Sequence, residues 1–130
     1  WGMDEAVQRW MAKTGEAGAI VVGIWNSPQR WQDYMPARPL LAVEAQSLLR
    51  RFVKSAGGPP QSDEYLQFMV DELKPHIDAH YRTLTGQPHT LVMGSSMGGL
   101  ISLYALCEYP QVFGGAGCVS THWPAGGGGW

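Results

Sequence analysis

The sequence has few charged residues, only two cysteines and no long apolar run. Charged residues make up 15% of the 130 residues and hydrophobic residues 45%, a balance typical of one folded domain with a buried core. No run of about 18 apolar residues occurs, so the sequence predicts no membrane-spanning helix. The formal net charge of −2 argues against electrostatic binding of nucleic acid or of an anionic membrane.

The cysteines do not form a recognisable pattern. Cys107 and Cys118 lie in apolar stretches and belong to no CxxC or Cys/His spacing. We therefore expect two small core residues rather than a disulfide or a metal pair, and we expect no metal site. The cellular compartment stays open, because the chain begins at Trp1 and not at a methionine. We expect that a preceding segment was removed, so the lack of a signal peptide carries no information.

Helical and strand-like segments alternate along the chain. Apolar spacing predicts helices over residues 3–13, 40–54, 62–81 and 97–109. Short apolar runs predict strands over residues 19–25, 90–94 and 114–120. Strands separated by helices favour a parallel sheet, so the predicted fold class is α/β.

Three local features refine this pattern. Residues 26–39 contain several prolines and are predicted to form a long ordered loop. Ser62 is predicted to be the N-cap of the helix that follows it. Pro75 lies inside the helical stripe and should kink or divide that helix.

The motif that carries chemistry is Gly-Ser-Ser-Met-Gly-Gly at residues 94–99, between a predicted strand and a predicted helix. In this context a G-x-S-x-G pattern predicts a sharp turn that exposes the hydroxyl of Ser96 as a nucleophile. We expect Gly94 and Gly98 to be glycines because side chains there would collide across the turn. The N–H of Met97, at the start of the helix, is a candidate oxyanion donor. Ser95 and Gly99 complete the motif.

The motif has two other interpretations. A glycine-rich turn without function is one, because the five-residue pattern also occurs by chance. A dinucleotide-binding loop is the other, but it needs G-x-G-x-x-G and position 96 is serine. No Walker-type lysine follows either. The catalytic interpretation is favoured because the expected strand precedes the motif and the expected helix follows it.

Several segments resemble the putative-esterase family of α/β-hydrolases, which is similar to the esterase D, feruloyl-esterase and enterochelin-esterase groups. The residues that carry the resemblance are Val92–Leu100, Ala105, Tyr109-Pro110, Phe113, Ile20–Ile24, Arg30 and Tyr34-Met35-Pro36. The resemblance implies one partial α/β-hydrolase domain over residues 1–130, a parallel sheet flanked by helices that lacks N-terminal and C-terminal strands. It also implies hydrolysis of a small-molecule carboxylic ester through a serine acyl-enzyme, without a cofactor.

The resemblance also shows what these residues do not supply. In this fold the nucleophile is followed by an Asp or Glu and then by a His. After Ser96 the chain contains only Glu108 and His122 of these types. Glu108 lies at the far end of the predicted helix, and the family's histidine follows a later strand. We therefore expect the triad acid and base, and the second oxyanion donor, to lie outside this chain.

The remaining candidates concern the substrate pocket. His122 follows a strand at its carboxyl end, where α/β sheets bind ligands, and Arg30 and Tyr34 lie on the predicted long loop. Each is a pocket candidate. The alternative is loop packing for Tyr34, a surface or loop-packing role for His122, and pairing with a carboxylate for Arg30. His76, His80 and His89 are expected to be solvated.

Two rival functions stay open, an acyltransferase on the same fold and a non-catalytic binding module. The resemblance implies a further strand that precedes residue 3 in the chain. In the sheet this strand would lie between the strands predicted at residues 19–25 and 90–94. We therefore expect residues 1–130 alone to be marginally stable and catalytically silent.

Overall fold

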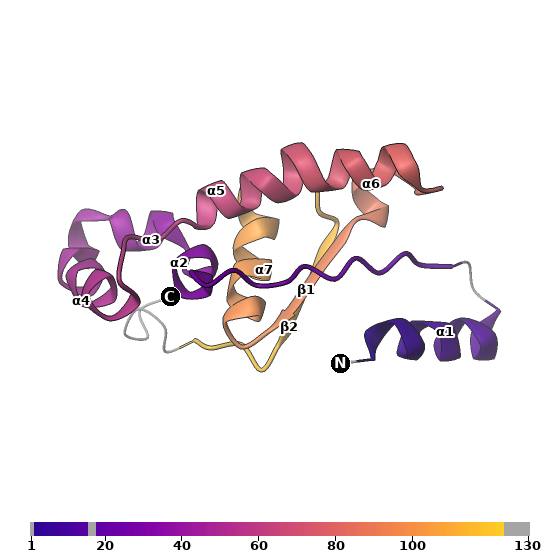
Figure 1. Ribbon diagram of the computed structural model, residues 1–130, viewed down its shortest axis with the longest axis horizontal. Coiled ribbons are helices and arrows are strands. Elements are labelled where there is room, and N and C mark those ends of the chain that lie inside the picture. Colours follow the sequence, from indigo (N-terminus) through magenta and orange to yellow (C-terminus); the bar gives the residue numbers. More distant parts are fainter. Residues whose placement is uncertain (1, 16–17, 124–130) are drawn as a thin grey trace.

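The computed structural model describes residues 2–15 and 18–123. Figure 1 shows the order and arrangement of the elements. The helices are α1 (Met3–Thr14), α2 (Arg30–Tyr34), α3 (Ala37–Leu41), η1 (Val43–Ala45), α4 (Gln46–Ala56), α5 (Ser62–Gln67), η2 (Phe68–Leu73), α6 (Lys74–His80), η3 (Gln87–His89) and α7 (Met97–Glu108). The strands are β1 (Leu91–Ser95) and β2 (Gly115–Val119). No helix among the described residues is long and apolar enough to cross a membrane.

The centre of the fold is a small parallel sheet with a helix packed on it. β1 and β2 pair in parallel, with Leu91 opposite Gly115 and Ser95 opposite Val119. α7 connects the two strands and packs against both, since a parallel pair requires a crossover connection. The predicted strands at residues 90–94 and 114–120, and the helix between them, are confirmed.

The predicted strand over residues 19–25 is wrong. This segment is extended but has no regular secondary structure, and its Trp25 side chain is 95% exposed. β-branched residues favour an extended backbone, but a strand also needs a neighbour to pair its N–H and C=O groups. Within the described residues this segment has no such neighbour.

The predicted long loop over residues 26–39 is also wrong, because it contains α2 and most of α3. The backbone of this segment is held by partners distant in sequence. The Gln32 side chain donates to the carbonyl of Ala56 (2.9 Å), and the Gln32 carbonyl accepts from the N–H of Gln61 (2.8 Å). These bonds join α2 to both ends of the connection between α4 and α5, a tertiary effect that proline content does not reveal.

Ser62 does not cap its own helix, as the sequence predicted. Gln61 is the N-cap of α5, and Ser62 is its fully buried first residue. The Ser62 Oγ instead accepts a hydrogen bond from the N–H of Ala37 (2.9 Å). Ala37 begins α3, where an N–H has no partner inside the helix. The serine therefore caps a different helix from the one predicted.

The helix that contains Pro75 continues through it, so the predicted kink or division takes the form of an inserted π-helical segment. α5 passes into the π-helical segment η2, and α6 begins at Lys74, with Pro75 in its first turn. Figure 1 shows the three segments as one rod over the sheet and α7. Proline has no N–H and its ring clashes with the carbonyl of an ordinary preceding turn. The wider π turn ends just before this position, where it relieves both problems.

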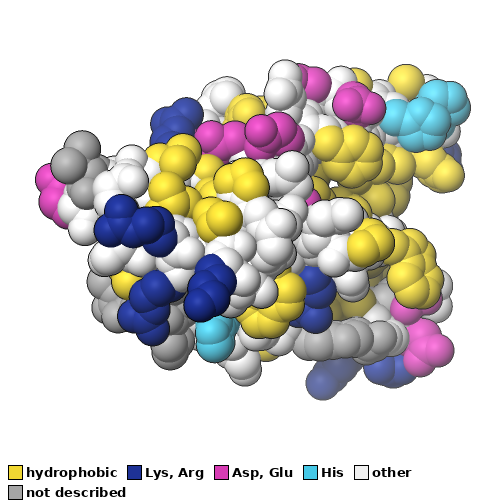
Figure 2. Space-filling view, turned by 60° about the vertical axis from the view of Figure 1, so that its left-hand side comes forward, with side chains coloured by type: hydrophobic (Ala, Val, Ile, Leu, Met, Phe, Trp, Pro, Cys, Tyr) yellow, Lys and Arg dark blue, Asp and Glu magenta, His cyan; other side chains and the backbone are white. Residues whose placement is uncertain are grey.

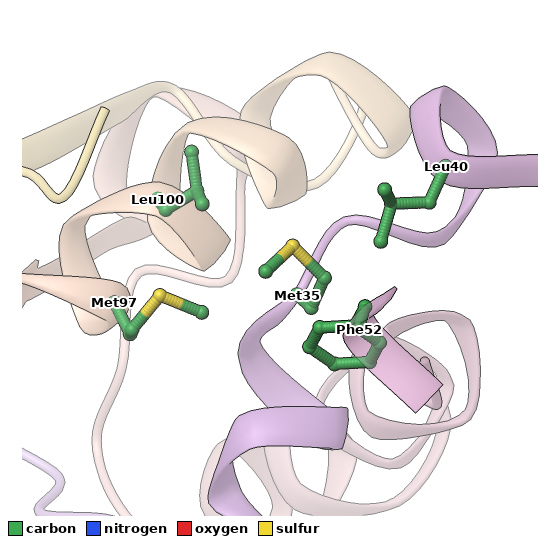
Figure 3. Packing of buried hydrophobic residues seen from close by; sticks show 5 residues of the cluster. All are labelled: Met35, Leu40, Phe52, Met97 and Leu100. Carbon is green, nitrogen blue, oxygen red and sulfur yellow. The ribbon is translucent and has the colours of Figure 1, made fainter. Parts of the chain in front are cut away.

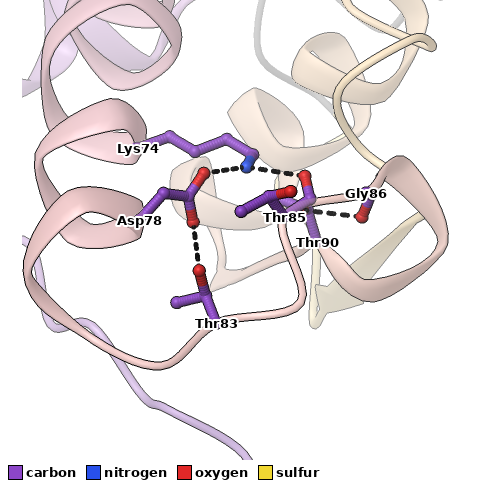
Figure 4. A network of polar contacts seen from close by, with 6 residues as sticks. All are labelled: Lys74, Asp78, Thr83, Thr85, Gly86 and Thr90. Atoms are coloured by element: carbon purple, nitrogen blue, oxygen red, sulfur yellow. Dashed lines mark hydrogen bonds and ion pairs between the residues drawn. The ribbon is translucent and has the colours of Figure 1, made fainter.

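A polar network fixes the end of this rod to the turn that leads into β1 (Figure 4). The Lys74 ammonium contacts the Asp78 carboxylate (2.5 Å) and donates to the carbonyl of Thr85 (3.0 Å). The Thr83 hydroxyl donates to the other Asp78 oxygen (2.8 Å). The hydrogen bond from Lys74 lowers the pKa of the Asp78 carboxyl, and the bond from Thr83 lowers it further.

Two apolar clusters share α7. The first consists of Met35, Leu40, Phe52, Met97 and Leu100, and the second of Leu66, Ile101, Tyr104, Ala105 and Phe113. The clusters join α7 to α2–α4 on one side and to α5 on the other. Each buried side chain of this size contributes about 1.5–3 kcal/mol of burial free energy, so these clusters hold the helices in place around the sheet.

The prediction that both cysteines are core residues is wrong. Cys107 and Cys118 are free, as expected, but both are exposed. Cys107 belongs to α7, which is apolar on nearly all sides, so its neighbours in sequence did not identify the buried face. Cys118 lies near the exposed end of β2.

Tyr104 joins three helices through one phenol. Its hydroxyl donates to Asp63 of α5 (2.7 Å) and accepts from the N–H of Arg38 in α3 (3.4 Å). Burial raises the pKa of Tyr104, and the hydrogen bond to Asp63 raises it further. The folded protein therefore favours the neutral phenol.

We expect Tyr104→Phe to lower the free energy of unfolding by about 1–2 kcal/mol at pH 7, because the bond to a charged group is lost. The folded pKa of Tyr104 lies above its unfolded value of about 10. Its contribution is therefore complete below about pH 10 and is lost as the pH rises through the folded pKa. Urea unfolding of wild type and variant from pH 7 to 11 checks this, and a constant difference across that range would contradict it.

Candidate active site

Ser96 occupies a sharp turn between β1 and α7. β1 ends at Ser95 and α7 begins at Met97, so one residue makes the change of direction. The backbone of Ser96 has φ 58° and ψ −119°, a region that residues with a side chain rarely adopt. Ser96 is exposed. The strand, turn and helix that the motif predicts are therefore present, while the catalytic role of Ser96 stays a prediction.

The glycines of the motif have different tasks. A Cβ on Gly94 would lie 2.4 Å from the carbonyl oxygen of Gly98, so the predicted steric need for glycine at 94 is confirmed. A Cβ on Gly98 would meet nothing within 4 Å, so the same prediction for Gly98 is wrong. The second close contact is at Gly99, where a Cβ would lie 2.6 Å from the Thr121 Oγ1. The backbone of Gly98 lies close to Gly94, but a side chain on Gly98 would point into free space.

The loop after β2 holds the backbone of Ser96 from both sides. The N–H of Ser96 donates to the carbonyl of Val119 (2.9 Å), and the carbonyl of Ser96 accepts from the N–H of His122 (3.2 Å). Ser120, between them, has a left-handed backbone with φ 44°. These backbone contacts stabilise the turn, and the motif alone does not reveal them because they involve residues more than twenty positions away.

Thr121 fills the space between this loop and the start of α7. Its Oγ1 lies against Gly99, and it is a buried side-chain oxygen without a hydrogen-bond partner among the described residues. Such an atom carries a desolvation cost of about 1–3 kcal/mol. The buried Thr121 side chain packs closely on Gly99. In the sequence, the glycine at position 99 indicates that another group comes close to the backbone there.

The start of α7 offers two hydrogen-bond donors. Within the described residues, the N–H groups of Met97 and Gly98 have no acceptor, as expected in the first turn of a helix. The Met97 side chain is 1% exposed and packs in the first cluster (Figure 3). The Met97 N–H, the predicted oxyanion donor, is thus held in place by the buried side chain of the same residue.

Neither of the triad residue types after Ser96 forms a triad with it. Glu108 pairs with Arg38 (2.6 Å) and lies at the other end of α7, about 18 Å away along the helix axis. His122 is exposed, and the contact it makes with Ser96 is through its backbone N–H. The loop therefore brings His122 beside Ser96, while Glu108 is excluded as its acid partner by distance.

The two pocket candidates on α2 differ in their surroundings. Arg30 is exposed, with its guanidinium 5.7 Å from the centre of the Trp31 ring. Tyr34 is half-buried, and its ring lies 5.3 Å from that of Tyr65. Burial raises the pKa of Tyr65, and Tyr34 raises it further. Tyr34 thus has the packing role that was its alternative, whereas Arg30 is free of any ion pair within the described residues.

The upstream histidines His76, His80 and His89 are exposed, as expected. The rings of His76 and His80 stack at 4.1 Å, and one ring nitrogen of His80 lies 2.7 Å from the carbonyl of His76. The described part of the chain contains no group of three or more His, Cys, Asp or Glu side chains that could hold a metal ion.

We expect Gly94→Ala to lower the free energy of unfolding by more than about 2 kcal/mol, because the new methyl group would overlap backbone atoms that have no room to move. Gly98→Ala is the matched control. It should leave stability unchanged or raise it by up to about 1 kcal/mol, since alanine is the better helix former. Urea unfolding of the protein expressed from its full reading frame measures both. Equal destabilisation by the two substitutions would contradict the steric assignment.

Comparison with known proteins gives a family and two relatives. The model of the family described as "Putative esterase" matches residues 1–127. "Uncharacterized protein YbbA" of Bacillus subtilis (strain 168) is 35% identical over 106 residues, which cover 80% of this chain and 38% of that protein. An "Endo-1,4-beta-xylanase/feruloyl esterase" of Xylanibacter ruminicola is 29% identical over 120 residues, 92% of this chain and 15% of that protein. No solved structure gives a significant match.

The chain thus spans less than half the length of each of these relatives. Membership of the family implies an α/β-hydrolase-like fold, with which the parallel strand pair and its helices agree. The match extends over nearly the whole chain, including the turn at Ser96 and the loop that holds it. This chain belongs to the esterase family.

Proposed function

We propose that the chain forms part of a carboxylic ester hydrolase in which Ser96 is the nucleophile. The observation that carries this proposal is the exposed serine with φ 58° at a one-residue turn from strand to helix. A strained backbone costs about 1–3 kcal/mol and persists only where the surroundings hold it. Here the turn is held by close packing at Gly94 and Gly99 and by hydrogen bonds of the Ser96 backbone with Val119 and His122. A turn without function would not require a strained backbone.

The proposed reaction proceeds in two steps. The Ser96 Oγ attacks the carbonyl carbon of the ester, its proton passes to a general base, and the carbonyl oxygen becomes an oxyanion. The N–H of Met97 donates to that oxygen, aided by the positive end of the α7 dipole. The alcohol leaves with a proton, and water then hydrolyses the acyl-enzyme to release the acid.

The general base and its acid partner belong to the part of the proposal that residues 1–130 do not supply. Glu108 is committed to Arg38 at the distant end of α7, and we assign His122 to the pocket beside Ser96. We propose that an Asp or Glu and a His outside these residues complete the triad, in the chain order of the fold. The word "esterase" in the name of the Xylanibacter ruminicola relative supports a carboxylic ester as the substrate.

We expect Ser96→Ala to abolish hydrolysis of p-nitrophenyl butyrate, with a loss of at least about 1,000-fold in kcat, since no other group would form the acyl-enzyme. The assay uses the protein expressed from its full reading frame. Ser55→Ala, at an exposed serine of α4, is the control and should retain wild-type activity.

A fluorophosphonate probe tests the nucleophile independently of the substrate. Labelling at Ser96, located by peptide mass spectrometry, and its loss in Ser96→Ala would support the proposal. Labelling elsewhere, or none at all in the folded protein, would refute it and favour a binding module. Product analysis with an added alcohol distinguishes a hydrolase from an acyltransferase, because only the latter makes the new ester in preference to the free acid.

A further inference from the structure

The charges of the chain are unevenly distributed. Residues 26–61, which contain α2–α4, carry five of the nine Lys and Arg residues but only two of the eleven Asp and Glu residues. This unit is therefore net positive in a chain whose formal charge is −2. Figure 2 shows Lys and Arg side chains gathered on the side of the molecule where these helices come forward.

Most of these cations are not neutralised by neighbouring side chains. Arg38 pairs with Glu108, but four exposed cations make no ion pair within the described residues: Arg30, Arg50, Arg51 and Lys54. Of the two anions in the unit, Asp33 accepts a hydrogen bond from the Ser27 hydroxyl, and Glu44 is exposed. We define the four unpaired cations, Arg30, Arg50, Arg51 and Lys54, as the basic patch.

The unit that carries the basic patch packs against Met97, the residue that follows the candidate nucleophile. Met35, the residue after α2, and Phe52 of α4 lie in one cluster with Met97, the residue after Ser96 (Figure 3). α4 turns Phe52 toward this cluster, and its three cations, Arg50, Arg51 and Lys54, are exposed. Charges on this surface act over about 8–10 Å in salt solutions near 0.1 M. The cluster that α4 shares with Met97 places this helix on the side of the molecule where α7 begins.

Arg30 is the cation of the patch with a neighbouring aromatic ring. The Arg30 guanidinium lies over the Trp31 ring, an arrangement that restrains the side chain and leaves its N–H donors available. A planar guanidinium matches the two oxygens of a carboxylate. Arg30 begins α2, the helix that ends one residue before Met35 of the shared cluster.

We propose that the substrate is an ester that carries a second, anionic group, and that the basic patch attracts and Arg30 binds this group. The inference rests on the proposed esterase function and names its substrate class. Positive potential beside a reaction centre raises the local concentration and the association rate of anionic substrates. It does little for a neutral ester, so the preference should appear in kcat/KM.

The experiment compares matched esters in the protein expressed from its full reading frame. p-Nitrophenyl hemisuccinate and p-nitrophenyl butyrate place the charge, or no charge, on the acyl side. 4-Carboxyphenyl acetate and phenyl acetate do the same on the alcohol side. The measured quantity is the ratio of kcat/KM for the anionic ester to that for its neutral partner. Comparing this ratio between variants cancels the different intrinsic reactivities of the esters.

Three variants locate the effect. Arg30→Gln removes the proposed binding residue, and Arg50→Gln/Arg51→Gln/Lys54→Gln removes the rest of the basic patch. Arg9→Gln/Lys13→Gln/Arg82→Gln changes the net charge by the same amount as the latter, at positions outside the patch. We expect the first two variants to lower the ratio about 3- to 10-fold for at least one ester pair, and 0.5 M NaCl to reduce the difference. The third variant should lower the ratio by less than about 2-fold.

The outcomes separate this inference from the function on which it rests. A fall confined to the basic-patch variants supports it, and the ester pair affected shows which side carries the anion. Unchanged ratios in both pairs, or an equal fall in the charge-matched control, would overturn it even though Ser96-dependent hydrolysis persists. Absence of all ester hydrolysis and of fluorophosphonate labelling at Ser96 would instead overturn the proposed function.

Discussion

The structure around the candidate site depends on holding Ser96 in a backbone conformation that it would not adopt alone. A positive φ with a side chain present is unfavourable, so the neighbours must compensate. The N–H of Ser96 is bound by Val119 and its carbonyl by His122, and the absence of a side chain at Gly94 allows the helix to approach the strand. The pairing of β1 with β2 places these groups within reach of one another. A change in the register between β1 and β2 would therefore move the backbone of Ser96, and with it the exposed hydroxyl.

Sequence reasoning was reliable where the signal is local and strong. The helix over residues 3–13, the strand before the motif and the helix after it were all predicted, because apolar periodicity is a property of short segments. The turn at Ser96 was predicted for the same reason. Its surrounding strand and helix gave the five-residue pattern its meaning.

The errors share a different cause, the need for a partner distant in sequence. Residues 19–25 have the composition of a buried strand, yet no neighbouring strand lies beside them in the described structure. Ser62 has the composition of an N-cap, yet its hydroxyl binds the first amide of α3. Gly98 was expected to be sterically required, but that role belongs to Gly99 through its contact with Thr121. None of these partners can be located before the chain is folded.

The π-helical segment η2 also determines how α6 is rotated relative to α5 about the axis of the rod. A π turn accommodates one more residue than the α-helical turn it replaces, so it is equivalent to a single-residue insertion within a regular helix. Each residue of an α-helix advances the helical face by about 100°. Without the extra residue, α6 would be rotated relative to α5, and Lys74 and Asp78 would lie on another face of the rod. The widened turn therefore sets the rotational phase that allows the rod to be fastened to the base of the sheet.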